Sequence, residues 1–159
     1  DRVKEIFKLS QGEYIAPSKL EAMYIKSPLV SQICVYGNPE ESFLIAIVII
    51  ARKNLEATLI ERRLYLETEI QGMKGEAFKK VLRREEVLEL YKKEFNRIAE
   101  DSMFNSLEKP KGIILSDVEF STENGMMTPS MKVIRRNIEK KFAWEIQKAY
   151  NSKDNTPKF

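Results

Sequence analysis

Lysine residues in two separate segments have a type and a setting that suit anion binding. Lys132 follows a Thr-Pro-Ser-Met loop, residues 128–131, and stands just before a predicted helix. An ammonium group on a long stem is a compact point charge that suits phosphate and carboxylate, and a helix N-terminus adds a preference for anions. The alternative is that the loop only caps the helix. Because the chain has no Walker loop and no G-x-G-x-x-G pattern, this is not a self-sufficient nucleotide site.

The second segment lies at the start of the chain. Lys4 and Lys8 flank the apolar pair Ile6 and Phe7, and Gly12 follows between two short extended stretches. A glycine in such a place lets the backbone approach another molecule without a side chain in the way. Taken alone, an amphipathic hairpin with solvated lysines is the simpler interpretation.

The composition excludes several kinds of site. With no His and only one Cys, Cys34, the chain cannot supply a zinc cluster, a haem ligand pair, a Ser-His triad or an internal disulfide. Cys34 lies in the apolar run 29–36, which favours an inert core thiol. The net charge of +3 is too small to argue for nucleic acid.

Two local clusters of basic residues and one group of methionines are less ordinary. The basic clusters lie within Lys79–Arg84 and Lys132–Lys141. A solvated helix face is the simpler interpretation of the first cluster, whereas a functional role is favoured for the second, which contains the candidate anion-binding lysine. Met126, Met127 and Met131 would suit a methionine-rich groove, but strand packing is the simpler interpretation.

The elements that would position these residues can be predicted from the spacing of apolar side chains and from Gly and Pro. Extended stretches are expected at 6–9, 13–15, 29–36, 43–50 and 112–115, and helices from 17 or 18, at 54–69, at 84–103 and from 134 to 149. The run 43–50 is almost continuously apolar, which is typical of a central strand covered on both faces, and it should pair antiparallel with 29–36. Ser18 and Glu21 have the spacing of a capping box. The predicted class is α+β, a small and mainly antiparallel sheet with packed helices and an N-terminal hairpin.

The ends of the chain and its longest apolar run bear on its context. The longest apolar run has eight residues, far short of a membrane span. The chain opens on charged residues and without Met, so we expect a piece of a longer protein. The polar tail 151–159 is expected to be frayed.

Two motifs in the right order carry a family resemblance. Residues 8–17 read Lys-Leu-Ser-Gln-Gly-Glu-Tyr-Ile-Ala-Pro, and residues 123–132 read Glu-Asn-Gly-Met-Met-Thr-Pro-Ser-Met-Lys. Together with Arg2, Lys4, Glu21 and Arg135-Arg136, they closely resemble the C-terminal domain of the acyl-adenylate-forming enzymes, and the long-chain fatty-acyl-CoA synthetase branch fits best. The resemblance covers residues 1–150. Many relatives have Gly where this chain has Met131, which should make the loop stiffer.

The resemblance implies a fatty acid–CoA ligase. Such enzymes activate a carboxylate with ATP to acyl-AMP and then transfer the acyl group to the thiol of CoA. A separate N-terminal adenylation domain would hold the ATP and its Mg²⁺ and the long-chain fatty acid, so the fragment alone should be inactive. The C-terminal domain would swing between two poses, each with its own charges for one half-reaction.

The same resemblance assigns roles to individual residues. Arg2 matches the arginine that contacts the AMP ribose, and Lys4 matches the hinge. Lys132 matches the catalytic and nucleotide-binding lysine of adenylation, which bridges the carboxylate and the α-phosphate. A further group belongs to the hairpin that faces the active site during thioester formation: Lys8, Gly12, Glu13 and Tyr14. Within this group Lys8 would be the catalytic lysine. Arg135 and Arg136 would either position Lys132 or meet the phosphates of CoA, and no metal ligand is expected.

The resemblance also implies domain limits and a location. Residues 1–17 would form the hinge and hairpin, 18–121 the sheet and helices, and 122–150 the catalytic-lysine loop and final helix. The full protein would lie in the cytoplasm or on the cytosolic face of a membrane such as the endoplasmic reticulum, attached only through parts outside this fragment. No nucleic-acid partner is expected. The alternatives are another acyl-adenylate-forming ligase, a non-catalytic basic binding module, or a catalytically inactive fragment of such an enzyme.

Overall fold

The centre of the molecule is a three-stranded sheet in the order β3–β4–β5. The structure, a computed structural model, describes the backbone of residues 5–154 and the side chains of residues 5–152. The strands are β3 (Val30–Tyr36), β4 (Ile45–Ile50) and β5 (Gly112–Ser116). β3 and β4 pair antiparallel, as predicted, whereas β5 runs parallel to β4.

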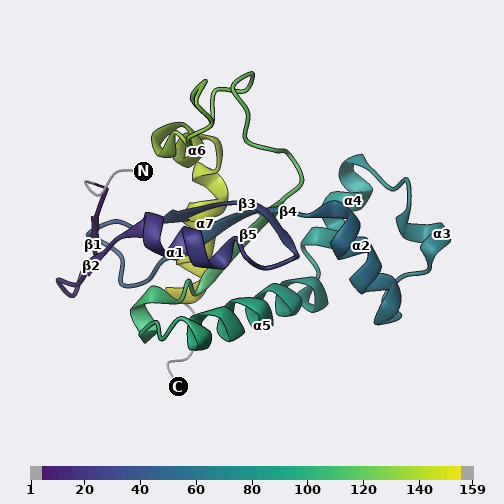
Figure 1. Ribbon diagram of the computed structural model, residues 1–159, viewed down its shortest axis with the longest axis horizontal. Helices are drawn as coiled ribbons and strands as arrows, with labels where there is room; N and C mark the ends of the chain where they lie inside the picture. The colour runs from purple at the N-terminus through teal and green to yellow at the C-terminus, as the bar shows by residue number, and fades with distance from the viewer. Residues whose placement is uncertain (1–4, 155–159) are drawn as a thin grey trace.

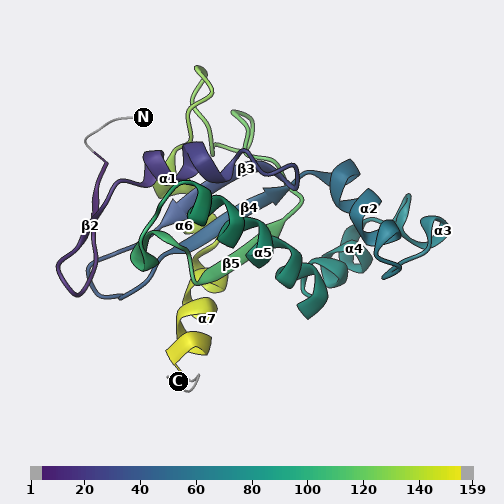
Figure 2. The ribbon, with the colours of Figure 1, turned by 60° about the horizontal axis from the view of Figure 1, so that its bottom comes forward.

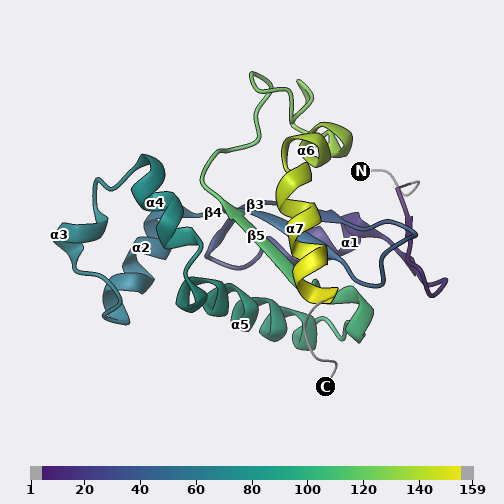
Figure 3. The same cartoon turned by 180° about the vertical axis from the view of Figure 1, so that it is seen from behind.

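Helices cover both faces of this sheet, which gives three layers (Figures 1 and 2). Helices α1 (Pro17–Tyr24) and α5 (Glu85–Asp101) lie on one face. Helices α6 (Arg135–Lys141) and α7 (Ala143–Asp154) lie on the other, where Figure 3 shows α7 in front of the strands. The α+β class is therefore confirmed.

β4 joins the two layers because each of its faces is buried. Ile45, Ile47 and Ile49 pack against α6 and α7, while Ala46 and Val48 face the other way, toward α1 and α5. Successive side chains of a strand point to opposite faces, and a strand covered on both sides must be apolar throughout. Since burying one isoleucine contributes about 1.5–3 kcal/mol, this strand holds both layers together.

Three short helices form a lobe that extends away from the sheet (Figures 1 and 3). They are α2 (Arg52–Glu61), α3 (Glu67–Ile70) and α4 (Gly75–Leu82). The single helix predicted at 54–69 is therefore wrong in its second half. Arg63 takes a positive φ of 62°, and the amide of Leu64 donates to the carbonyl of Leu59, which reverses the chain. Leu66 consequently lies exposed instead of on the apolar face.

Two other expectations need correction. The Ser18–Glu21 capping box does not form, because α1 begins at Pro17 after Ala16, with no side-chain cap. Proline is suited to a first helical position since it has no N–H to leave unpaired. The final helix is split at Phe142 into α6 and α7, and α7 continues to Asp154, past position 150 where the tail was expected to begin.

Candidate functional site

Lys132 closes a tight turn at the tip of the segment that precedes α6. The amide of Thr128 donates to the carbonyl of Lys132 at 2.8 Å, and the amide of Met131 donates to the carbonyl of Thr128 at 2.8 Å. The hydroxyl of Thr128 also accepts from the amide of Lys132 at 3.1 Å. Met131 is left in the left-handed region with a φ of 68°. This is a three-residue loop, a turn followed by one left-handed residue, and it holds the backbone of Lys132 while its side chain lies exposed.

The N-terminal hairpin contains a turn of the same design. It joins β1 (Phe7–Lys8) to β2 (Tyr14–Ile15). The amide of Leu9 donates to the carbonyl of Glu13, and the amide of Gly12 donates to the carbonyl of Leu9, both at 2.8 Å. Gly12 has a φ of 93°, so it occupies the left-handed position that Met131 occupies in the other turn.

The two turns project from different parts of the molecule. In Figures 1 to 3 the β1–β2 hairpin extends from one end of the sheet, whereas the segment 121–134 extends from the side of α6. Lys8 and Tyr14 belong to the hairpin, and the ammonium of Lys8 lies 5.8 Å from the centre of the Tyr14 ring. Both side chains are exposed, as are Gly12 and Glu13. The structure therefore places Lys8 and Lys132 on two separate projections (Figures 1 and 3).

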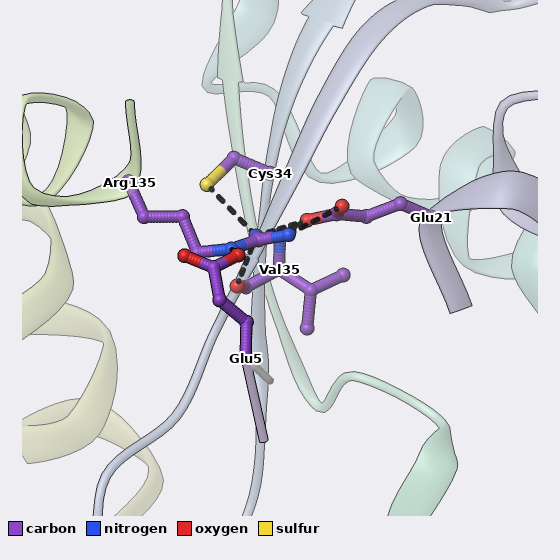
Figure 4. Close-up of polar contacts among 5 residues, drawn as sticks. All are labelled: Glu5, Glu21, Cys34, Val35 and Arg135. Atoms are coloured by element: carbon purple, nitrogen blue, oxygen red, sulfur yellow. Dashed lines mark hydrogen bonds and ion pairs between the residues drawn. The ribbon is translucent and has the colours of Figure 1, made fainter. Parts of the chain in front are cut away.

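Arg135 lies three residues after Lys132 but is held inside the domain. Its guanidinium makes a two-pronged ion pair with the carboxylate of Glu21 on α1, one of whose N–O distances is 2.8 Å (Figure 4). It also donates to Glu5 at 2.7 Å and to the carbonyl of Val35 at 3.4 Å. Both oxygens of Glu21 accept from Arg135, and one of them, Oε2, also accepts from the amide of Val35 at 2.7 Å. The side chains of Arg135 and Glu21 are only 12% and 14% exposed.

Of the two roles predicted for Arg135, this arrangement favours the positioning of Lys132 over contact with the phosphates of CoA, which stays a prediction. Burial on its own lowers the pKa of Arg135, but the hydrogen bonds to Glu21 and Glu5 raise it above its ordinary value, so the group stays charged and paired. A guanidinium already bound by two carboxylates has little left for a phosphate. Arg136 next to it is exposed, so its predicted role stays a prediction. Arg2 and Lys4 lie outside the described residues.

The thiol beside this ion pair lies in the core, as predicted. Cys34 is buried, and its sulfur lies 3.7 Å from a nitrogen of Arg135. Burial, reinforced by the negative charge of Glu21, raises the pKa of the Cys34 thiol to about 12. A thiol with such a pKa is protonated at neutral pH and is a poor nucleophile.

The first basic cluster takes the simpler of its two interpretations, whereas the methionines are divided: Met126 is packed in the core, and Met131 is not packed as that interpretation predicts. Met126 is buried in the cluster beneath α6, while Met131 is 66% exposed at the turn, so the methionines do not line one groove. Arg83 and Arg84 make ion pairs with acidic neighbours at 2.8 Å and 3.1 Å on the surface of the lobe. Exposed pairs of this kind contribute little and are typical of a solvated face.

Two kinds of site have no counterpart in the part of the chain that the structure describes. Within residues 5–154 no three acidic or cysteine side chains gather as ligands for a metal ion. None of the helices in that same range has the length and apolar character needed to cross a bilayer.

The sequence of this chain is similar to known proteins over almost its whole length. The sequence profile described as "AMP-binding enzyme C-terminal domain" matches residues 19–99. Among curated proteins, "Long-chain-fatty-acid--CoA ligase 1" of Cavia porcellus is 37% identical over 152 residues, which are 96% of this chain and 20% of that protein. "Long chain acyl-CoA synthetase 3" of Arabidopsis thaliana is 36% identical over 94% of this chain and 21% of its own length. The chain thus spans about a fifth of the length of these relatives.

A solved structure supports the same conclusion. The A-PCP didomain of carboxylic acid reductase from Segniliparus rugosus, in complex with AMP, matches 98% of this chain with a TM-score of 0.74 and 31% identity, over 18% of that protein's chain. The match therefore covers the hairpin, the sheet and the segment with Lys132. The chain belongs to the AMP-binding enzyme C-terminal domain family.

Proposed function

We propose that this chain is the mobile C-terminal domain of a long-chain fatty acid–CoA ligase. The observation that carries the proposal is the pair of like turns that project from different parts of one rigid core, each presenting a lysine. Two half-reactions with different charges need two such faces, because groups preorganised for one reaction are out of place in the other. The similarity to long-chain ligases over nearly the whole chain supports the choice of substrate class.

In the first half-reaction an oxygen of the fatty acid carboxylate attacks the α-phosphorus of ATP, and pyrophosphate leaves. Both reactants are anions, and the ammonium of Lys132 would neutralise them as they approach and as charge builds on the phosphorus. The ordered turn beneath Lys132 supports this role, because it fixes the backbone of Lys132 at a place where its long side chain lies exposed. ATP and its Mg²⁺ would be held by the separate N-terminal domain.

In the second half-reaction the sulfur of CoA attacks the carbonyl carbon of the acyl-AMP, and AMP leaves. The hairpin with Lys8, Glu13 and Tyr14 would then face the active site. Gly12 supports this role because its left-handed backbone and missing side chain keep the tip of the hairpin narrow. Rotation of the domain would exchange one turn for the other.

The test measures both half-reactions in the full-length protein. Lys132→Ala should slow palmitate-dependent exchange of pyrophosphate into ATP by about 10²- to 10³-fold, the usual cost of one donor to a transition state. The same variant should convert supplied palmitoyl-AMP and CoA to palmitoyl-CoA at a near-normal rate. Lys8→Ala should show the reverse pattern, less sharply, because the hairpin backbone also contributes.

Lys140→Ala is the matched control, since Lys140 is an exposed lysine on α6 and belongs to neither turn. It should leave both half-reactions unchanged. If Lys132→Ala impaired thioester formation as badly as adenylation, the division between two poses would be wrong. Fragment 1–159 alone should release no pyrophosphate from ATP and palmitate, and clear turnover would contradict the need for a second domain.

A second candidate uses the same first half-reaction with a different thiol. The carboxylic acid reductase domain that resembles this chain was solved together with a PCP domain. An acceptor assay separates the two candidates. Acyl transfer to CoA supports the ligase, and transfer only to the phosphopantetheine of a carrier protein would favour the alternative.

A further inference from the structure

Arg135 joins three parts of the domain that are far apart in sequence. Figure 4 shows its guanidinium between Glu21, Val35 and Glu5. Glu21 lies on α1, Val35 lies on β3, and Glu5 precedes the first strand of the hairpin. One side chain at the start of α6 therefore binds a helix, a strand and the N-terminal segment at once.

The two carboxylates that bind Arg135 differ in their surroundings. Glu21 is 14% exposed and also accepts a hydrogen bond from the backbone of β3, so it belongs to the core. Glu5 is 45% exposed and lies two residues before Phe7, the first residue of β1. The bond from the Nε atom of Arg135 to Glu5 thus fastens a point outside the hairpin ladder to the core.

The sequence position of Glu5 gives this bond its significance. Glu5 follows Lys4, the residue predicted to act as the hinge, and Arg135 follows Lys132 by three residues. In the proposed function the domain is joined to its partner domain through the residues before Glu5, so the position of the Lys132 turn depends on how firmly Glu5 is held to the core. If Glu5 were loosely held, the domain would turn about several residues and Lys132 would arrive with poor precision.

We propose that Arg135 is a positioning residue that clamps Glu5 to the core, so that the N-terminal segment and both turns move with the domain as one rigid body. The proposal rests on the proposed function, because it concerns how the two turns are delivered. Glu5 and Arg135 touch no substrate in it. The clamp acts within the moving domain, so it is present in both poses and should matter equally to both half-reactions.

Glu5→Gln in the full-length protein tests the clamp without breaking the core, because the pair between Arg135 and Glu21 is retained. A 1 Å misplacement can cost about 10²-fold in rate, and a partial loosening should cost about 10-fold in kcat for each half-reaction. The KM for ATP should not change, since ATP is held by the other domain. Amide hydrogen exchange in the peptide 5–9 should be about tenfold faster, with no change in peptides from α1 and β3.

Glu76→Gln is the control, since it removes a more exposed ion pair, with Arg83, from the distant lobe. It should change neither rate nor exchange. The clamp is refuted if Glu5→Gln leaves both half-reactions and the exchange of peptide 5–9 unchanged, or if it slows only one half-reaction. A lowered melting temperature in proportion to the lost rate would assign Arg135 a merely structural role. Absence of ligase activity in the wild-type protein would instead contradict the proposed function, while the exchange measurement would still decide on the clamp.

Discussion

The ion pair between Arg135 and Glu21 should be a main contributor to the stability of this domain. Glu21→Gln keeps the volume of the side chain but removes its charge and one of its two acceptors. Arg135 holds Glu21 through two N–H groups, so the amide NH₂ of Gln would face one of them donor to donor. No cavity forms, and the effect is therefore electrostatic.

The expected loss of stability depends on the contacts that remain after Glu21→Gln. Removing one partner of a buried pair typically costs about 3–5 kcal/mol, because the other charge is left uncompensated. Here Glu5 still neutralises part of the charge on Arg135, and the oxygen of Gln can still accept from the amide of Val35. We therefore expect a loss of about 2–3 kcal/mol in the free energy of unfolding. At this chain length that corresponds to a drop in Tm of roughly 4–12 °C.

Urea denaturation of the domain, followed by circular dichroism, measures this loss directly. The domain has its own apolar clusters on both faces of the sheet, so we expect it to fold alone. Glu86→Gln is the control, because it breaks an exposed pair with Arg84 and should leave the midpoint unchanged. If Glu21→Gln were as mild as this control, the pair would add no net stability and the reasoning from burial would be wrong.

Further experiments test the reactivity of Cys34 and the backbone of the two turns. Since the pKa of Cys34 is raised to about 12, its thiolate fraction at pH 8 should be about 10³-fold below that of an ordinary thiol, and mass spectrometry of iodoacetamide-treated native protein should find the Cys34 peptide unmodified. Rapid alkylation in the native state would contradict the burial of this thiol. Met131→Gly should raise the free energy of unfolding by about 0.5–1 kcal/mol, because glycine removes a left-handed strain of about 1–2 kcal/mol at some cost in entropy. Gly12→Ala should do the opposite in the matching turn, and urea midpoints of both variants decide whether the two turns are alike.

The strands were largely predictable because their signal is local. A run such as 43–50, apolar at every position, has few structures open to it other than a strand buried on both faces. The helix at 54–69 was predicted wrongly because its apolar spacing continues past the real end. Leu66 has the right interval but follows a reversal at Arg63, and no glycine or proline marks that reversal.

The role of Glu21 was missed although its signal was present. Its spacing from Ser18 fits a capping box, and that local explanation was preferred to a role for Glu21 in a buried ion pair. Pro17, Leu20 and Tyr24 are the buried residues of α1, and Glu21 falls on the same helical face. A carboxylate on an apolar face needs a cation, because an unpaired buried charge is too costly. The sequence therefore implied a partner for Glu21, but only the fold could show that the partner is more than a hundred residues away.

The two cations near the second turn illustrate why residue type decided between the core and the surface. Arg135 offers a planar fork of N–H groups that can satisfy a carboxylate at two points and still reach a second acid, so burial suits it. Lys132 has a compact charge on a flexible side chain. It cannot bind a carboxylate at two points as arginine does, but it can follow an anion that moves. In this motif the arginine therefore stabilises the domain close to the turn that carries the lysine. Changing Arg135 is accordingly expected to lower the activity, although Arg135 contacts no substrate in this proposal. A positioning residue should affect both half-reactions, whereas a catalytic residue of one turn should affect mainly one of them.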